Sequence, residues 1–227
     1  MRRLKLFLLK YKNQLRFYFN KNISSKIFMG SGVQILGVDN ILIKDNCTIG
    51  ENTLFTINNR FDKSVQLTIG RNVYVGRDNF FSVGKSINIS DYCIFGNKCS
   101  FICSDHIFDN PLIPYALSGN SYEKAIFIET NCWLGHNVSV IGNVRIGYGS
   151  IVGANTVITK DIPPFSMVVG NPAKIIKTYN FSLKKWIVET SDAPKFENED
   201  DYLSYLKSNN GDVNLGFHSG SSKAGHL

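Results

Sequence analysis

The sequence predicts an all-β solenoid, a parallel β-helix of about five to six coils with three short strands in each coil. Apolar residues recur at every sixth position through the middle of the chain, and Asn, Asp or Gly mostly stands three residues after each. No apolar run approaches the ~18 residues of a membrane-spanning helix. The 227 residues are 43% hydrophobic and 19% charged, which excludes a disordered chain and a coiled coil.

Residues 1–26 are the first predicted element, a basic amphipathic helix. They contain eight Lys or Arg and no acidic residue, and the rest of the chain is nearly neutral, which argues against a nucleic-acid reader. An apolar stripe of Leu4, Leu8, Tyr11, Leu15 and Tyr18 has helical spacing. It either packs against its own domain or a neighbouring subunit, or lets residues 1–22 contact an anionic membrane surface. Lys5 interrupts the apolar run and no cleavage site follows, unlike a secretory signal.

The repeat follows, in a predicted domain of residues 27–177. We call the apolar residue of each hexad its lead position; all fifteen are apolar: Ile43, Ile49, Phe55, Ile69, Val75, Phe81, Ile89, Phe95, Phe101, Ile128, Leu134, Val140, Ile146, Val152 and Ile158. A sandwich of short strands would instead alternate with period two. Three hexads make one triangular coil, and the lead side chains fill its interior.

The fourth residue of each hexad predicts a corner with positive φ, because Asn, Asp and Gly adopt that conformation most cheaply. These positions are Asn46, Asn52, Asn58, Asn72, Asp78, Gly84, Tyr92, Lys98, Ser104, Asn131, Asn137, Asn143, Gly149, Asn155 and Asp161. Four of the five cysteines, Cys47, Cys93, Cys99 and Cys132, share one phase of the repeat. We therefore interpret them as small residues in a repeated slot, in a reducing compartment, and not as disulfides or metal ligands.

Two segments depart from the repeat. Residues 104–127 form a long loop that returns to the coils in register, and such an excursion is often functional. Residues 178–227 form a C-terminal extension: FSLKKWIVET (181–190) is expected to be a short helix, 189–201 are acidic, and GFHSGSSKAGHL (216–227) is a polar tail. The two prolines at 163–164 are expected to end strand pairing before that extension.

Two stretches carry a family resemblance: Trp133–Lys177 (WLGHNVSVIGNVRIGYGSIVGANTVITKDIPPFSMVVGNPAKIIK) and Ile89–His106 (ISDYCIFGNKCSFICSDH). They resemble the hexapeptide-repeat acyltransferases, including galactoside, maltose, xenobiotic and capsular-polysaccharide O-acetyltransferases. The resemblance covers about Ile41–Lys177. It implies a left-handed β-helix, acetyl-CoA as co-substrate with no bound prosthetic group or metal, and a homotrimer with active sites between subunits.

The resemblance implies that His106, at the mouth of the loop, is the catalytic base, since an imidazole takes up and returns protons near neutral pH. A surface histidine without a role is the alternative. Asp105 or Asp109 could orient its ring, as could a backbone carbonyl. Many family members have a second histidine here, whereas this chain reads SDHIFDN. The resemblance also places the backbone amide of His136 at the oxyanion that forms on the thioester.

Further positions come from the same resemblance. The coenzyme is expected along the last coils, at Trp133, Gly135, Ala154, Thr159, Lys160 and Lys174. Either lysine could instead be ordinary solvated charge, and Trp133 could cap a coil corner. The acceptor side is expected at Tyr74, Trp133 and Tyr115, although Gly76 replaces an asparagine found in many relatives and Tyr115 could simply pin the loop. The acceptor sugar, its form, and acetyl over longer acyl groups stay undetermined.

The predicted function is O-acetylation of a sugar in bacterial surface-glycan synthesis, by a cytoplasmic protein that works at or near the inner face of the membrane. The first alternative is N-acyl transfer to an amino-sugar nucleotide on the same fold. A zinc hydratase on this solenoid would need three imidazoles, and only His106 and His136 lie within the repeat. A non-catalytic binding solenoid is the remaining alternative.

Overall fold

The computed structural model describes residues 17, 20–188 and 195–210. Residues 1–16 and 18–19 of the predicted N-terminal helix lie outside these ranges, as does the polar tail from 216 onward. Residues 20–26 are described and are not helical; they form a turn and the bridge from Ile23 to Ile43. No helix in the part of the chain that the structure describes has the length and apolar character needed to span a bilayer.

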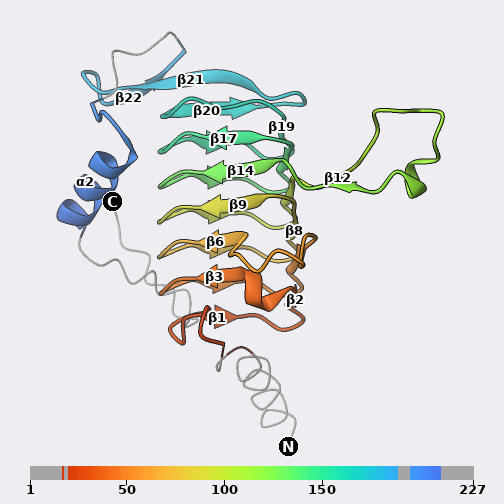
Figure 1. Ribbon diagram of the computed structural model, residues 1–227. Coiled ribbons are helices and arrows are strands. Elements are labelled where there is room, and N and C mark those ends of the chain that lie inside the picture. Colours follow the sequence, from red (N-terminus) through yellow and green to blue (C-terminus); the bar gives the residue numbers. More distant parts are fainter. Residues whose placement is uncertain (1–16, 18–19, 189–194, 211–227) are drawn as a thin grey trace, which may run out of the picture.

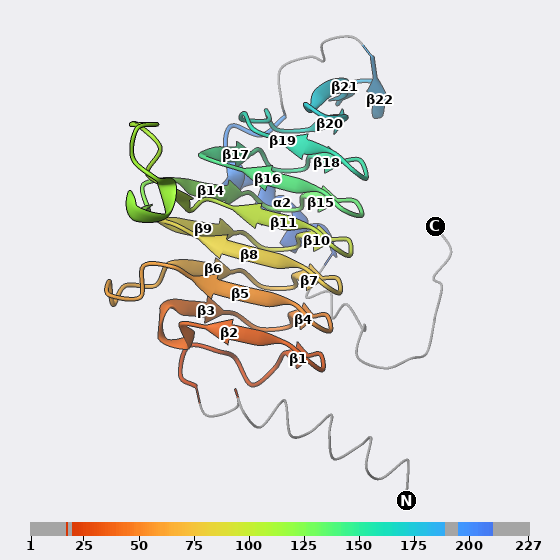
Figure 2. The same cartoon turned by 90° about the vertical axis from the view of Figure 1, so that its right-hand side faces the viewer.

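The described chain winds into a three-sided column whose sides are parallel β-sheets (Figures 1 and 2). Within each coil the chain passes through the three sheets in turn. Since the third sheet has six strands, the column has six coils, which agrees with the predicted solenoid. A further strand, β20 (Ser166–Val169), continues the second sheet above the last coil.

The strands of the three sheets follow in coil order. The first sheet contains β3 (Ile41–Ile43), β6 (Leu67–Ile69), β9 (Ser86–Ile89), β14 (Ala125–Ile128) and β17 (Val144–Ile146). The second contains β1 (Phe28–Met29), β4 (Thr48–Ile49), β7 (Tyr74–Val75), β10 (Ile94–Phe95), β15 (Trp133–Leu134), β18 (Ile151–Val152) and β20, and it ends with two antiparallel strands, β21 (Lys174–Asn180) and β22 (Lys185–Ile187). The third contains β2 (Gln34–Leu36), β5 (Leu54–Ile57), β8 (Phe80–Val83), β11 (Ser100–Ile102), β16 (Ser139–Ile141) and β19 (Val157–Ile158).

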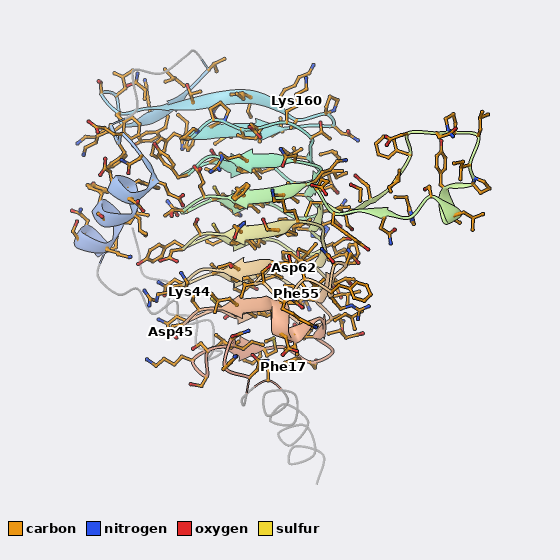
Figure 3. The ribbon with its side chains drawn as sticks, in the orientation of Figure 1. Phe17, Lys44, Asp45, Phe55, Asp62 and Lys160 are labelled. Atoms are coloured by element: carbon orange, nitrogen blue, oxygen red, sulfur yellow. The ribbon has the colours of Figure 1, made fainter. Side chains whose placement is uncertain are left out.

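The lead side chains point into the column and stack on one another. In the third sheet Phe55 pairs in register with Phe81, and Phe81 with Phe101. Their ring centroids are 4.7 and 4.5 Å apart, and all three side chains are fully buried. Figure 3 shows Phe55 within the lower part of the column. Burial of such a side chain contributes roughly 1.5–3 kcal/mol, so each coil depends on its neighbours to cover its apolar edge.

The sequence analysis missed the first coil. Ile23, Met29 and Ile35 are buried and repeat the six-residue step, and Gly32 forms a corner with φ of 72°. Ile23 bridges to Ile43 of the second coil. The signal is present in the sequence, but η1 (Val38–Asn40), a 3-10 turn, adds two residues before the next lead position and hides the phase.

Ten of the fifteen predicted corners have positive φ, and they are the first and second corners of each coil. The prediction is wrong at the third corner, where Asn58, Gly84, Ser104, Asn143 and Asp161 are absent from the positive-φ residues. The reason is visible in β5 and β8, which continue two residues beyond the lead position and bury Ile57 and Val83. In these two coils the third side is therefore longer than predicted. In the fifth coil the left-handed residue is Gly142 (φ of 96°), one position before the predicted Asn143.

A column of glycines lines the second corner, directly after the lead residue of the second sheet. A Cβ atom at Gly96 would lie 2.7 Å from the carbonyl carbon of Gly135 and 2.8 Å from the nitrogen of His136. A Cβ atom at Gly50 would lie 2.4 Å from the carbonyl oxygen of Gly76. These contacts are with backbone, which cannot rotate away. The second corner therefore fixes how closely successive coils approach.

Insertions leave the column at the third corner. The largest contains a small antiparallel hairpin of β12 (Asp105–His106) and β13 (Asn120–Ser121), with the 3-10 turn η2 (Tyr115–Leu117) between them. It projects far from the sheets (Figure 1). The predicted loop of residues 104–127 is too long at its end, since Ala125, Ile126 and Phe127 already belong to β14 and pair with β9.

The C-terminal extension differs from the expected one. Residues 181–190 were predicted to contain a helix, but Lys185–Ile187 form β22, which pairs antiparallel with β21 (Lys174–Asn180). Trp186 packs edge-on against Tyr179 across this hairpin, a cross-strand contact typical of strands. The C-terminal helix is α2 (Glu199–Asn210), and the side chain of Asn198 caps it by accepting a hydrogen bond from the Asp201 N–H (3.0 Å).

All five cysteines are buried free thiols. In the shared slot each thiol donates to a corner carbonyl of the next coil, as Cys47 does to Gly70 (2.9 Å) and Cys99 does to Gly135 (3.1 Å). Burial raises the pKa of Cys47 to about 12 and the pKa of Cys99 and Cys103 to about 11. Because a thiolate is the nucleophile, these side chains are structural.

We expect Gly96→Ala to lower the free energy of unfolding by about 1–3 kcal/mol, because the new methyl group meets the backbone of the next coil. Lys98→Asn is the matched control at the same corner. Lys98 has φ of 61°, which Asn adopts more cheaply, so this variant is expected to be as stable as the wild type or more so. Urea unfolding at pH 7 checks both; a Gly96→Ala protein of unchanged stability contradicts the close-approach account.

Stability is expected to fall above about pH 9. An ordinary thiol, as in the unfolded chain, ionises near pH 9.0, whereas the folded Cys47 thiol ionises near pH 12. The contribution of the buried neutral thiol to the free energy of unfolding is therefore complete below pH 9. It is lost as the pH rises from about 9 to about 12, because ionisation then favours the unfolded chain. At pH 10 the loss is about 1.4 kcal/mol for one such thiol. Cys47→Ser, which places serine where Ser150 stands in a later coil, should make the decline between pH 8 and pH 10 shallower in urea titrations; an identical decline contradicts the assignment.

Candidate active site

His106 lies on the hairpin that leaves the third corner of the fourth coil. Its side chain is exposed, and the main chain of its strand pairs with Asn120 in β13. The hairpin encloses a pocket of about 420 Å³, lined by residues 105–109 and 120–124, so that both His106 and Asp109 border it. Within the described residues the His106 imidazole makes no hydrogen bond, and it is therefore free to accept one from a bound molecule.

The predicted orienting residue Asp105 has a different partner. Its carboxylate forms an ion pair and hydrogen bond with the Lys124 ammonium group. Lys124 lies where the chain returns from the hairpin, directly before β14. Lys124 Nζ also lies 5.8 Å from the centre of the Phe108 ring. The two ends of the hairpin are thus joined at its root, directly beside His106. Sequence reasoning missed Lys124 because nineteen positions separate it from Asp105 and no local pattern links them.

A second group of polar side chains lies beneath the hairpin root. The Asn58 amide donates to Ser82 Oγ (3.0 Å) and to Ser104 Oγ (2.7 Å), and the two hydroxyl groups are 2.7 Å apart. These residues come from three successive coils. The network fixes Ser104, two residues before His106, and it explains why this polar residue stands where a turn residue was predicted.

At the second corner the backbone amide of His136 differs from its equivalents in other coils. The carbonyl of His136 accepts a hydrogen bond from the Asn155 N–H (2.9 Å), while the His136 N–H donates none within the described residues. The equivalent Arg77 N–H, two coils below, donates to the Asn97 side chain (2.9 Å). The imidazole of His136 is exposed, so the backbone amide and the side chain can be separated by mutation.

Ala154 lies directly above Gly135 at this corner. Its nitrogen would be 2.8 Å from a Cβ atom at Gly135, and its own small side chain is exposed. Thr159 and Lys160 are exposed after β19, and Lys174 is exposed at the start of β21. Figure 3 places Lys160 at the upper end of the column.

The two predicted aromatic residues of the second sheet share its outward face. Tyr74 pairs in register with Ile94, and Ile94 with Trp133. Trp133 is 53% exposed, so it offers a free ring face. Tyr115, the third residue predicted on the acceptor side, lies instead in η2 of the hairpin and is half exposed.

The predicted site residues therefore fall into two groups in one chain. His106, Asp105, Asp109 and Tyr115 belong to the hairpin at the third corner. Tyr74 and Trp133 lie on the second sheet, and Gly135, His136 and Ala154 lie at its second corner. Thr159 and Lys160 follow β19 at the third corner, two coils above the hairpin, and Lys174 begins β21. None of these residues lines the hairpin pocket. Within the described residues, no group of three His, Cys, Asp or Glu side chains is placed to hold a metal ion.

Comparison with known proteins confirms the resemblance that the sequence carries. Residues 125–160 match the family model of the bacterial transferase hexapeptide (six repeats). A Staphylococcus aureus protein provisionally named an acetyltransferase is 39% identical over 132 residues, which are 57% of this chain and 64% of the relative. An Escherichia coli protein provisionally named a lipopolysaccharide-biosynthesis O-acetyltransferase is 35% identical over 132 residues, 58% of this chain and 63% of the relative. The chain spans less than two thirds of the length of these curated relatives.

A solved structure supports the architecture. Galactoside acetyltransferase in complex with coenzyme A superposes with a TM-score of 0.54 and 21% identity, over 84% of this chain and 90% of that chain. This likeness concerns the fold, which is the left-handed parallel β-helix that the resemblance implied.

We expect Lys124→Gln to loosen the hairpin without unfolding the column. The Asp105–Lys124 pair is partly exposed, and such pairs contribute up to about 1 kcal/mol. Hydrogen exchange at the Ile107 amide, which donates to the Gly119 carbonyl, should accelerate by up to about fivefold. Lys85→Gln, at the same corner, is the control and should leave the rate unchanged. Equal rates in both variants would show that the ion pair does not hold the hairpin.

Proposed function

We propose that the protein transfers an acetyl group from acetyl-CoA to a hydroxyl group of a sugar, with His106 as the general base. The observation that carries the proposal is the free imidazole of His106. It stands at the edge of a hexapeptide-repeat column, on a hairpin whose two ends are linked by the Asp105–Lys124 ion pair. Because no described residue occupies this imidazole, it can accept a hydrogen bond from a reacting molecule.

The names of the similar proteins support the sugar acceptor. The relative from Escherichia coli is named for lipopolysaccharide biosynthesis and O-acetyl transfer, and the solved relative acts on galactosides and binds coenzyme A. We therefore place the acceptor among bacterial surface glycans, either capsule or lipopolysaccharide. A cytoplasmic site at the inner face of the membrane would suit this work, with residues 1–22 as the membrane contact.

The reaction would proceed by direct attack. The His106 imidazole accepts the proton of the sugar hydroxyl while its oxygen bonds to the thioester carbonyl carbon. The carbonyl oxygen becomes negative, and the free N–H of His136 donates to it. When the C–S bond breaks, the imidazolium returns its proton to the leaving sulfur, which leaves free coenzyme A and the acetyl ester.

The residues of the upper coils are suited to the coenzyme. The narrow pantetheine arm needs small residues beside it, which Gly135 and Ala154 provide at the second corner. Lys160 and Lys174 are exposed cations that would pair with the phosphates, and Thr159 would border the same groove. Trp133 offers a ring face either to the coenzyme arm or to the sugar.

The active site is completed by a second copy of the chain in this proposal. His106 and the His136 amide lie at different corners, so one chain does not bring them together. The hairpin carries apolar residues without cover, including Phe108 (62% exposed), Leu112 (90%) and Leu117 (78%). A neighbouring subunit would cover them, and a homotrimer with three sites between subunits is the assembly we propose. Tyr115 would then face the acceptor from the hairpin side.

His106→Ala should lower kcat by about 10²–10⁴ and leave the affinity for acetyl-CoA almost unchanged, because only proton transfer is lost. His136→Ala is the matched control; it removes an imidazole but retains the backbone N–H, so kcat should change by less than about threefold. Coenzyme release with a glycan hydroxyl acceptor measures kcat, and calorimetry measures coenzyme affinity. A loss of only a few-fold in His106→Ala would exclude His106 as the base. Equal turnover of an amino-sugar nucleotide would favour N-acyl transfer.

A further inference from the structure

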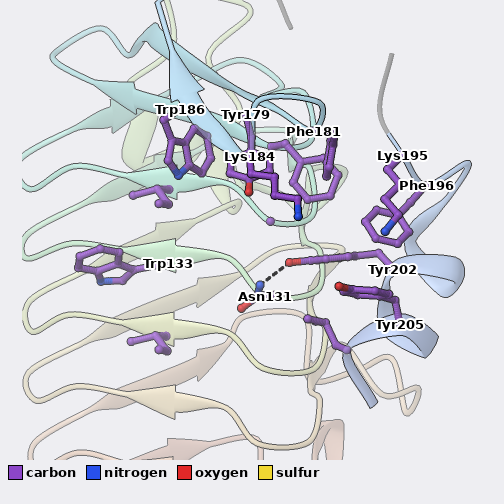
Figure 4. A pocket seen from close by; sticks show the side chains of 15 residues that line it. Asn131, Trp133, Tyr179, Phe181, Lys184, Trp186, Lys195, Phe196, Tyr202 and Tyr205 are labelled. Atoms are coloured by element: carbon purple, nitrogen blue, oxygen red, sulfur yellow. Dashed lines mark hydrogen bonds between the residues drawn. The ribbon is translucent and has the colours of Figure 1, made fainter. Parts of the chain in front are cut away.

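A cavity separate from the hairpin lies between the second sheet and the C-terminal extension. We call it the C-terminal pocket. It has a volume of about 640 Å³, within the range of small-molecule sites. Its floor is the outward face of the second sheet, at Ile94, Trp133 and Ile151, and its walls come from the β21–β22 hairpin and α2 (Figure 4).

The wall formed by α2 is fixed to the column. The Thr130 backbone N–H and hydroxyl group both donate to the Glu199 carboxylate at 2.7 Å, and the Asn131 amide donates to the Tyr202 hydroxyl. Phe165, which lines the pocket, packs edge to face against Tyr148 with ring centroids 5.2 Å apart. The pocket is therefore formed by anchored elements and does not have to be assembled by its ligand.

Aromatic faces dominate the lining. Trp133 and Tyr205 remain 53% and 42% exposed, and Trp186 and Tyr179 stand on the hairpin wall. Both tryptophans of the chain take part. Flat rings that stay uncovered in a concave site provide apolar surfaces for the ring of a bound molecule.

The charge of the lining has one sign. Lys184 and Lys195 border the pocket, and no Asp or Glu is among its lining residues in the described part of the chain. Lys184 has φ of 51°, a conformation that Gly or Asn would adopt more cheaply. Its ammonium group is drawn toward the pocket beside Phe181 (Figure 4). Lys195 Nζ lies 4.8 Å from the centre of the Tyr205 ring.

We infer that the C-terminal pocket binds an anionic saccharide. The sugar ring lies against Trp133, Trp186 or Tyr205, and its carboxylate or phosphate pairs with Lys184 and Lys195. Lys184 and Lys195 are both exposed, so both can pair with an anionic group of the ligand, which a neutral sugar would not supply. No residue of the hairpin lines this pocket, but Trp133 belongs both to its floor and to the proposed coenzyme or acceptor side, so the two sites share that residue.

Intrinsic fluorescence tests the inference directly, because both tryptophans line the pocket. The full chain is titrated with a glucuronate-containing tetrasaccharide from hyaluronan and with glucose 1-phosphate, which separate carboxylate from phosphate recognition. Maltotetraose and inorganic phosphate are the uncharged and sugar-free comparisons. We expect saturable quenching by at least one charged saccharide, at least tenfold tighter than by either comparison, and the same binding in His106→Ala.

Variants locate the binding. The double variant Lys184→Gln, Lys195→Gln should weaken it at least tenfold, and Tyr205→Ala should weaken it without a change in the net charge of the protein. Lys185→Gln is the matched control, since Lys185 is adjacent but does not line the pocket. The inference is overturned if neither charged saccharide binds, if maltotetraose or inorganic phosphate binds equally well, or if Lys185→Gln has the same effect as the double variant. Displacement by acetyl-CoA would also overturn it, by assigning the pocket to the coenzyme.

Discussion

The close contact between successive coils at the second corner is the constraint on which the rest of this structure depends. At Gly50, Gly96 and Gly135 even a methyl group would overlap the backbone of the next coil. The strands are thereby held in register, so that Phe55, Phe81 and Phe101 stack in one line. The hairpin with His106 leaves the column at the third corner.

This constraint also determines where function can reside. The column itself is repetitive, and several of its candidate functional residues lie on segments added to the repeat, namely the hairpin and the C-terminal extension. The hairpin with His106 leaves the third corner, while the free amide of His136 and the exposed Ala154 belong to the second. The C-terminal extension covers part of the second sheet and creates a further pocket there. The proposed reaction uses both the hairpin and the second corner, and in that proposal a second copy of the chain brings them together.

Much of the fold could be predicted from the sequence, because a lead residue and a corner residue are each defined by local physics. The errors arise where geometry depends on distant partners. Asn58 does not have the predicted positive φ, because β5 continues past its lead residue to Ile57. Lys185–Ile187 form a strand through pairing with β21, although the sequence of this segment resembles a helix. The position of His106 at the start of the loop could be predicted from the sequence. The ion pair beside it could not, since Asp105 meets Lys124 only in the folded hairpin.

The central claim is that the hairpin of one chain completes the second corner of another, and a hybrid assembly tests it most directly. His106→Ala chains lack the base, and Ala154→Trp chains have an obstructed coenzyme groove; each alone should be inactive. Trimers containing both chains, isolated through two different affinity tags, should recover about a third of the wild-type activity, because one of the three pairs in each mixed trimer combines an intact hairpin with an intact groove. Hybrids as inactive as their parents would show that the site lies within one chain and would contradict the account.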